Sequence, residues 1–247
     1  MGGSEHNVAT GASRLGLSAC WVSRLPENAL GRMVRNKTRE FGVDTSHLVW
    51  AEGERLGLYF VEYGASPRSS SVLYDRAQSA ISRIQPGEVD WAAILSGARL
   101  FHTSGITPAL SPSAAATTVE ALRAARAAGC LVSYDLNYRA KLWSQEEARA
   151  CQEPLMELVD ILMTTEEDTA RVFGITADDY NQVAAKLAER FGFKVVTITL
   201  RDNPSVWHNT WTAIAYAGGR LYTDRTYDIE VVDRVGGGDA YGAGFLY

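Results

Sequence analysis

The chain has 247 residues, of which 46% are hydrophobic and 21% are charged, and its formal net charge at pH 7 is -5. A chain of this size and composition buries a sizeable core within one large domain. The net charge gives no electrostatic reason to bind nucleic acid or an anionic membrane, and no apolar run approaches the ~18 residues of a membrane span. The N-terminal residues do not resemble a signal peptide. We therefore expect an ordinary globular protein with the cytoplasm as its default location.

In the first half of the chain, β-prone runs alternate with helical ones. We predict a strand over Leu17–Val22, an amphipathic helix over Asn28–Phe41 and a short buried strand over Arg99–His102. Ser111 is the expected N-cap of a helix that reaches Ala128 and ends at a glycine. The proline after Ser111 is suited to the first turn of this helix.

The second half continues the alternation. We predict strands over Cys130–Tyr134, Ile161–Met163 and Val195–Leu200, with a helix from Ser144 and two helices before Arg190. Such an alternation predicts a mainly parallel sheet with helices on both faces. Ligand sites in sheets of this kind lie at the carboxyl ends of the strands.

One region departs from this alternation. Two β-prone runs between residues 55 and 76 are joined by a Gly/Ser/Pro turn, with no helix between them. They predict a hairpin that stands off the main sheet. We interpret it as a lid over a site, with an edge hairpin of no function as an equal alternative.

Cysteine and histidine spacing does not indicate a zinc site. The three cysteines lie far apart, without a Cys-x-x-Cys pair: Cys20, Cys130 and Cys151. The four histidines also show no ligand spacing: His6, His47, His102 and His208. We therefore expect a reducing compartment, core roles for Cys20 and Cys130, structural roles for the histidines and no protein-ligated metal centre.

The closing segment, Asp233–Phe245, carries the strongest chemical signal. Three consecutive glycines, Gly236, Gly237 and Gly238, let backbone N–H groups converge on a ligand, and Asp239 follows them. If a helix starts here, its N-terminus forms an anion hole, and Asp239 is a candidate general base for phosphoryl transfer. The alternative is an ordinary tight turn in which Asp239 is an N-cap. The sequence contains no Gly-x-x-x-x-Gly-Lys-Ser/Thr P-loop.

Two segments far apart in the chain resemble the paired signatures of the ribokinase-like (PfkB) carbohydrate kinases. Gly2–Gly16 is similar to the N-terminal signature of that family, and Asp233–Phe245 to the C-terminal one, with Gly-Gly-Gly-Asp in place of the commoner Gly-Ala-Gly-Asp. The resemblance implies a three-layer αβα sandwich with a mainly parallel central sheet and a small β-sheet lid. It also implies Asp239 as the base.

Within that family the resemblance is strongest to the 2-keto-3-deoxygluconate kinases. It rests on four segments: Gly57–Tyr63, Val72–Arg76, His102–Ser111 and Asp135–Arg139. Such kinases transfer the γ-phosphoryl group of ATP, with Mg²⁺, to the C6 hydroxyl of a keto-deoxy sugar acid. Two alternatives stay open: another kinase of the family, such as a fructokinase or nucleoside kinase, and an inactive module that only binds or pairs, as in a homo-oligomer joined through the lid.

The resemblance also assigns substrate-binding residues. An acidic sugar needs a cation for its carboxylate, and Arg139 with Arg76 provides planar donors of suitable shape. The other positions would contact the rest of the sugar: Gly3, Asn7, Tyr63, Tyr74 and Ile106. The alternatives are a structural ion pair for Arg139 and lid packing for Arg76 and the two tyrosines.

On the nucleotide side, the resemblance implies binding of ATP and Mg²⁺ near Asn137, Thr165, Asp168 and Arg201. Here the chain departs from its relatives: Thr165-Glu-Glu-Asp168 replaces an Asn-x-x-Glu motif, and residues 201–205 replace a Lys/Gly-rich loop. Relatives also begin about one strand and a lid segment earlier and continue past the last helix. We therefore expect residues 1–247 to form a single ribokinase-like domain, truncated at both ends, with the lid inserted at about 55–76.

Overall fold

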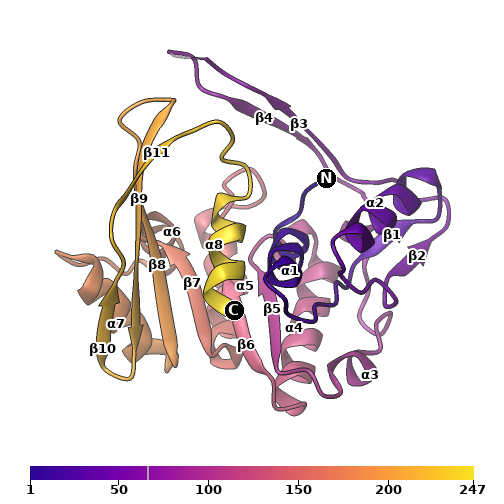
Figure 1. The fold of residues 1–247 in the computed structure, drawn as a ribbon. Coiled ribbons are helices and arrows are strands. Elements are labelled where there is room, and N and C mark those ends of the chain that lie inside the picture. Colours follow the sequence, from indigo (N-terminus) through magenta and orange to yellow (C-terminus); the bar gives the residue numbers. More distant parts are fainter. Residues whose placement is uncertain (66) are drawn as a thin grey trace.

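The computed structural model describes residues 1–65 and 67–247. Its main sheet has seven strands in this described part of the chain, in the order β10-β9-β8-β7-β6-β5, with β11 also paired to β9 (Figure 1). The parallel half is β5 (Leu100–Ser104), β6 (Leu131–Asp135), β7 (Ile161–Thr165) and β8 (Val195–Asp202). An antiparallel extension follows: β9 (His208–Ala217), β10 (Arg220–Thr223) and β11 (Tyr227–Glu230).

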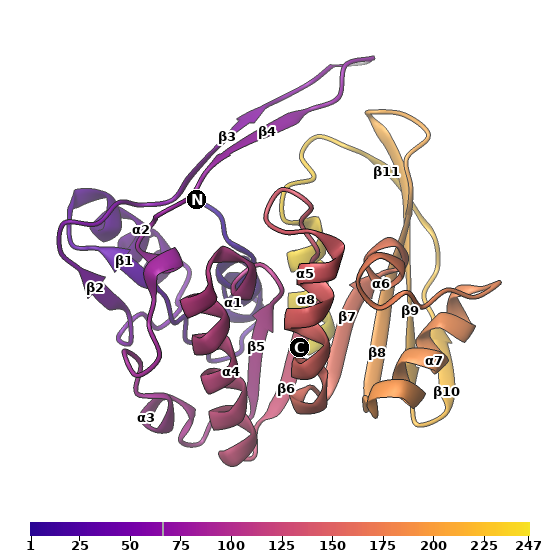
Figure 2. The same ribbon diagram turned by 180° about the vertical axis from the view of Figure 1, so that it is seen from behind.

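Helices cover both faces of this sheet, so the domain has three layers. One face carries α1 (Ser4–Arg14) and α8 (Gly237–Leu246), side by side in front of the sheet in Figure 1. Figure 2 shows the opposite face with α4 (Pro112–Ala127), α5 (Gln145–Gln152), α6 (Glu166–Phe173) and α7 (Tyr180–Phe191). The remaining short helices are α3 (Trp91–Leu95), η1 (Ile81–Arg83), η2 (Pro108–Leu110) and η3 (Glu153–Leu158). The predicted three-layer α/β fold is confirmed.

Local capping signals place several of these helices where the sequence predicts them. The Ser111 hydroxyl accepts a hydrogen bond from the N–H of Ala114 at 3.0 Å and starts α4. Ser144 and Glu147 form a reciprocal capping box at the start of α5. Asn28 caps α2 (Ala29–Glu40), close to the predicted range.

The central parallel strands form the core. Their side chains are buried on both faces of the sheet, as expected for strands between two helical layers. Tyr134 on β6 is fully buried, and its hydroxyl donates to Oε1 of Gln152 at 2.9 Å. A buried hydroxyl needs such a partner, and this bond ties β6 to α5.

A small unit beside the main sheet contains α2 and a two-stranded parallel sheet, β1 (Arg24–Pro26) with β2 (Val49–Ala51). The predicted strand over Leu17–Val22 is wrong. In that range only Cys20 forms a bridge, with Asp44, and regular pairing starts at Arg24. A strand needs a continuous partner, and residues 17–22 have one at a single position among the described residues.

The predicted hairpin is present as β3 (Leu58–Glu62) and β4 (Ser71–Asp75), which pair antiparallel. It projects from the body of the molecule above the carboxyl ends of the sheet strands (Figure 1). Its turn includes Ser66, which lies outside the described residues. Tyr59 lies opposite Tyr74, and Phe60 opposite Leu73 on the other face.

Close helix packing joins the two ends of the chain. A Cβ atom added to Gly11 on α1 would lie 2.5 Å from the Cβ of Ala243 on α8, so the two helices approach more closely there than a side chain allows. Such an approach brings the first turns of α1 and α8 together at the carboxyl end of the sheet. The three cysteines are free in the described residues: Cys130 is buried, as expected, whereas Cys20 is exposed, so its expected core role is wrong. None of the helices in the described part of the chain is long and apolar enough to cross a membrane.

Candidate active site

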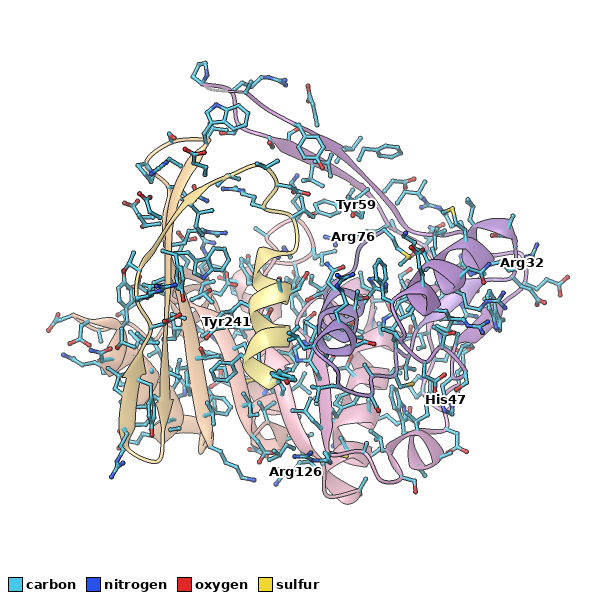
Figure 3. All side chains as sticks on the ribbon, in the orientation of Figure 1. Arg32, His47, Tyr59, Arg76, Arg126 and Tyr241 are labelled. Atoms are coloured by element: carbon cyan, nitrogen blue, oxygen red, sulfur yellow. The ribbon has the colours of Figure 1, made fainter. Side chains whose placement is uncertain are left out.

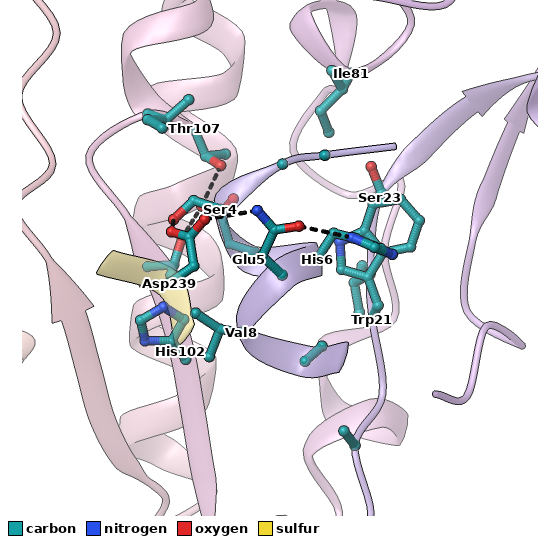
Figure 4. Close-up of a pocket in the computed structure, with 18 of the residues that line it drawn as sticks. Ser4, Glu5, His6, Val8, Trp21, Ser23, Ile81, His102, Thr107 and Asp239 are labelled. Atoms are coloured by element: carbon teal, nitrogen blue, oxygen red, sulfur yellow. Dashed lines mark hydrogen bonds between the residues drawn. The ribbon is translucent and has the colours of Figure 1, made fainter. Parts of the chain in front are cut away.

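Asp239 lies in the first turn of α8, where two side chains from the other end of the chain hold its carboxylate. The Ser4 hydroxyl donates to Oδ1 at 2.7 Å, and Nδ2 of Asn7 donates to Oδ2 at 2.7 Å. Figure 4 shows Asp239 beside Ser4. Because each oxygen has one donor, the orientation of the carboxylate is determined, and each oxygen keeps a further lone pair for a substrate proton.

Burial raises the pKa of Asp239, since it removes water from the charged form. The hydrogen bonds from Asn7 and Ser4 act in the opposite direction because they stabilise the carboxylate. The nearby Glu5 raises the pKa further, and Arg139 lowers it. A buried carboxylate with a raised pKa, held by two donors, is suited to take a proton.

The backbone before Asp239 makes an open helix N-terminus. The helix begins at Gly237, two residues before Asp239, with Gly236 as the cap at a φ of 80°. Asp239 is thus the third residue of the helix and not its N-cap. Among the described residues, the N–H groups of Gly238 and Asp239 have no hydrogen-bond acceptor, and no atom lies within 4 Å of a Cβ placed on Gly238. Free N–H groups beside open space fit an anion.

The loop after β6 brings further polar groups to the site. Asn137 has a φ of 42°, unusual for a residue other than glycine, and its Nδ2 donates to Oγ of Ser4 at 3.1 Å. Burial raises the pKa of Asp135 to about 7, with additional repulsion from Asp239 and Asp168. The carboxylates of β6, α6 and α8 therefore gather at one place, as expected where carboxyl ends of parallel strands meet.

Four arginines lie near one another at this end of the sheet: Arg76, Arg139, Arg201 and Arg234. None of them forms a salt bridge within the described part of the chain. Their charges are close enough to act on each other. Burial lowers the pKa of Arg201, and the neighbouring Arg234 and Arg139 lower it further. Arginines that gather without carboxylate partners favour an anionic ligand.

The lid hairpin closes over this region from above. The Arg76 guanidinium lies 4.2 Å from the ring centroid of Tyr74. Nζ of Lys141, from the same loop as Arg139, donates to the carbonyl of Val72 on β4 at 3.0 Å. A Cβ placed on Gly2 would lie 2.5 Å from the Tyr59 hydroxyl, so the lid touches the backbone before α1. Figure 3 shows Tyr59 and Arg76 between the lid and the helices.

A cavity of about 1590 Å³ runs beneath the lid and continues between α1 and β5. The residues that line it come from the lid, α1, the loops after β5 and β6 and the start of α8, and in its far part from residues 17–25, α3 and α4. They include nine predicted site residues: Gly3, Asn7, Tyr74, Arg76, Ile106, Asn137, Arg139, Gly236 and Asp239. The volume exceeds that of an ordinary small-molecule site because the cavity extends past these residues along β5.

The other predicted residues do not line this cavity in the described structure. Tyr63 is 61% exposed near the tip of the hairpin. Thr165 caps α6 by accepting from the N–H of Asp168 at 3.1 Å. Asp168 is buried and accepts from the N–H of Tyr138 at 3.2 Å. Arg201 lies on β8 against Trp211.

Sequence reasoning missed four residues that the structure brings to the site: Ser4, Glu5, Tyr59 and Asp135. Oε1 of Glu5 accepts from the N–H and the hydroxyl of Ser104 and from the hydroxyl of Thr107 (Figure 4). Glu5 therefore fixes α1 to the end of β5. All four residues lie within or next to the segments that carry the family resemblance, and this position could have predicted them as site residues.

The family model described as pfkB family carbohydrate kinase matches residues 1–247. The chain belongs to this family. Among curated relatives, the kinase is 40% identical over 244 residues to a 2-dehydro-3-deoxygalactonokinase of Haloferax volcanii, which covers 99% of this chain and 73% of that protein. It is 33% identical over 250 residues to a 5-dehydro-2-deoxygluconokinase of Shouchella clausii, covering 100% of this chain and 73% of that protein.

Solved structures agree with this membership. The kinase superposes on a 2-dehydro-3-deoxygluconokinase (EC 2.7.1.45) from Thermotoga maritima with a TM-score of 0.97 and 42% identity, over 100% of this chain and 77% of that one. A Ribokinase II of E. coli in complex with ATP and Mg²⁺ has a TM-score of 0.83 at 22% identity, over 99% of this chain and 74% of that one. The second likeness supports the fold alone.

Proposed function

We propose that the kinase transfers the γ-phosphoryl group of ATP to the C6 hydroxyl of 2-keto-3-deoxygluconate or a close keto-deoxy sugar acid. The observation that carries the proposal is one cavity that joins Asp239, at an open helix N-terminus, to Arg139 and Arg76, which have no ion-pair partner in the described structure. A neutral sugar gives no reason for these cations. The names of the relatives agree with a sugar acid.

Asp239 acts as the general base. Its carboxylate takes the proton of the attacking hydroxyl, while Ser4 and Asn7 hold the two oxygens in position. The N–H groups of Gly236, Gly238 and Asp239 at the start of α8 stabilise the negative charge of the transferring phosphoryl group, while the N–H of Gly237 donates to the carbonyl of Arg234 at 3.2 Å and helps to shape this anion hole. Positioning and charge stabilisation supply most of the rate enhancement in phosphoryl transfer.

The sugar acid lies between the lid and the sheet. Arg139, with Arg76, binds its carboxylate, and the Tyr74 ring covers one face of the sugar. Gly3, Asn7 and the backbone of Ile106 contact its hydroxyl groups, and Tyr63 reaches it when the lid closes further. Tyr59 joins this set, because its hydroxyl lies against Gly2 beside these groups.

Asn137, Thr165, Asp168 and Arg201 hold ATP and Mg²⁺. The fit is supported by the buried carboxylates of Asp135 and Asp168. Burial, and then the nearby charges of Asp239 and Asp168, raise the pKa of Asp135, and such clustered oxygens suit a hard cation. When bound, Mg²⁺ neutralises charge on the phosphates that ATP brings. An ATP-using kinase with three free cysteines fits a cytoplasmic location.

A substrate panel tests the proposal. With ATP, we expect the highest kcat/KM for 2-keto-3-deoxygluconate, ahead of fructose and adenosine. Arg139→Met should raise KM for the acid about 10- to 100-fold, the range of one hydrogen bond to a charged group, and should leave KM for a neutral keto-sugar unchanged. Arg123→Met, which removes an exposed arginine of α4, is the control. Faster turnover of fructose or adenosine would refute the sugar-acid assignment.

We also propose that the lid pairs with a second copy of the chain. Phe60 and Leu73 lie opposite each other on the outer face of the hairpin and are 56% and 67% exposed. An exposed apolar pair on a two-stranded sheet is a common mark of an interaction surface.

A further inference from the structure

Three side chains with different metal-binding atoms meet at one end of the α2–β1–β2 unit. They are Cys20, Asp44 and His47, and one ligand atom of each lies within 4.8 Å of the other two. Residue spacing did not predict this cluster, because Cys20 precedes α2 and the other two residues follow it. Cys20 borders the far part of the large cavity, but Figure 3 shows His47 well away from Tyr59 and Arg76, so the cluster lies apart from the proposed substrate-binding residues.

The backbone holds Cys20 and Asp44 side by side. They form an isolated parallel bridge, in which the N–H of Trp21 donates to the carbonyl of Asp44 at 2.9 Å and the N–H of Asp44 donates to that of Ala19 at 2.8 Å. The closeness of the two side chains therefore follows from paired backbone and not from a chance meeting of long side chains.

A tight turn brings His47 to the same place. The N–H of Ser46 donates to Oδ1 of Asp44 at 2.9 Å, and its hydroxyl donates to Oδ2 at 3.0 Å. These bonds orient the carboxylate and leave each oxygen another lone pair. In the described residues, neither the Cys20 sulfur nor the His47 ring nitrogens have a hydrogen-bond partner.

The donor set selects a class of cation. A thiolate, an imidazole nitrogen and a carboxylate oxygen together suit a borderline divalent ion such as Zn²⁺, whereas Mg²⁺ prefers oxygen ligands alone. Ligands at ~2.0–2.3 Å around a tetrahedral ion lie about 3.5 Å apart. The three ligand atoms lie within 4.8 Å of one another, so at most a short approach separates them from that spacing, and Cys20 and Asp44 are both exposed.

We propose that Cys20, Asp44 and His47 bind one Zn²⁺-like ion, with water in the remaining position. The ion links the segment before β1 to the segment before β2. Binding replaces the thiol proton of Cys20, as it does at other thiolate sites. The ion stabilises this unit and takes no part in phosphoryl transfer.

Cobalt(II) titration of the whole chain tests the proposal, because a thiolate ligand gives a sulfur-to-cobalt charge-transfer absorption in the near ultraviolet. We expect one equivalent of Co²⁺ to produce this absorption, Zn²⁺ to remove it and excess Mg²⁺ to leave it unchanged. An absorption that persists in excess Mg²⁺ also distinguishes this site from the carboxylates near Asp239, which as oxygen ligands would bind Mg²⁺. Zn²⁺ should raise the Tm of the wild-type chain.

Matched variants assign the ligands. Cys20→Ser should abolish the absorption, whereas Cys151→Ser, which changes another cysteine that is not fully buried, should keep it. His47→Gln should weaken Co²⁺ binding by about 10-fold or more, since even changes outside the ligands cost that much. It also provides a test that leaves the thiol in place. Absence of the absorption in the wild-type chain, or equal absorption and affinity in Cys20→Ser or His47→Gln, would overturn the proposal.

Discussion

Ser4→Ala should move the acid limb of the pH–rate profile to higher pH. The substitution removes a hydroxyl that donates to Oδ1 of Asp239 at 2.7 Å and leaves the Asn7 bond to the other oxygen intact. This donor stabilises the carboxylate and lowers the pKa of Asp239. The pKa of Asp239 should therefore rise in the variant, so the base is ionised only at higher pH.

The expected shift follows from the strength of this bond. A hydrogen bond to a charged group contributes about 1.5–3 kcal/mol, and one pKa unit corresponds to about 1.4 kcal/mol. A neutral Asp239 would keep part of the bond, so the lower end of this range applies. The acid limb should move up by about 1 pH unit.

The assay is kcat/KM for the sugar acid across pH, since its acid limb reports the base of the free enzyme. Ser13→Ala is the control: it makes the same change on α1, but that hydroxyl donates to the carbonyl of Phe41, far along the helix from Asp239. The control should retain the wild-type limb. An unshifted limb in Ser4→Ala, or a rate lowered equally at every pH, would refute the assignment of Asp239 as the titrating base.

Three further predictions concern stability and assembly. Burial raises the pKa of Asp135 to about 7 in the folded state, so the wild-type free energy of unfolding should fall as pH rises from about 4 to 7. Urea titrations of Asp135→Asn should lack this fall, and the two proteins should differ by an amount on the order of 2–3 kcal/mol in their change of unfolding free energy between pH 5 and 8. Parallel curves of unfolding free energy against pH would contradict the burial argument. Gly11→Ala should cost about 1–3 kcal/mol and lower Tm, since the new Cβ meets Ala243 at 2.5 Å. Gly244→Ala on α8 meets no atom within 4 Å and should not lower Tm; equal losses would argue against tight packing of the helices. Phe60→Ser should shift sedimentation of the protein toward the monomer, whereas an unchanged distribution would exclude lid pairing.

The sequence predicted those parts of the fold that local chemistry determines. Ser111 and Ser144 correctly predicted the starts of their helices, because a capping side chain bonds to backbone within the first helical turn. The lid hairpin was predicted from two β-prone runs joined by a turn. The antiparallel extension β9–β11 was missed. Its outer strands β10 and β11 are mostly exposed and carry no buried pattern, and β9 is defined by its pairing with β8. The helix α1 was missed as well, because it contains a glycine and a weak apolar face, and its packing on α8 is a long-range contact.

In the candidate site, too, local features were predicted and long-range contacts were not. Asp239 and its glycines were predicted from a motif that is continuous in the chain. The hydrogen bond from Ser4 to Asp239 joins residues from opposite ends of the chain, so no local pattern could reveal it. Among the described residues, the absence of ion pairs around Arg139 is likewise a property of the packed structure, as is the closeness of Cys20 to His47.

The most direct test of the central claim is the rate of ATP-dependent phosphorylation of 2-keto-3-deoxygluconate by wild-type and Asp239→Asn protein. Asparagine keeps the size of the side chain and an acceptor for Ser4 but cannot take the proton. We predict a fall in kcat of about 100- to 10,000-fold, the usual contribution of a general base, with little change in KM. Equal rates for the two proteins would show that Asp239 is not the base.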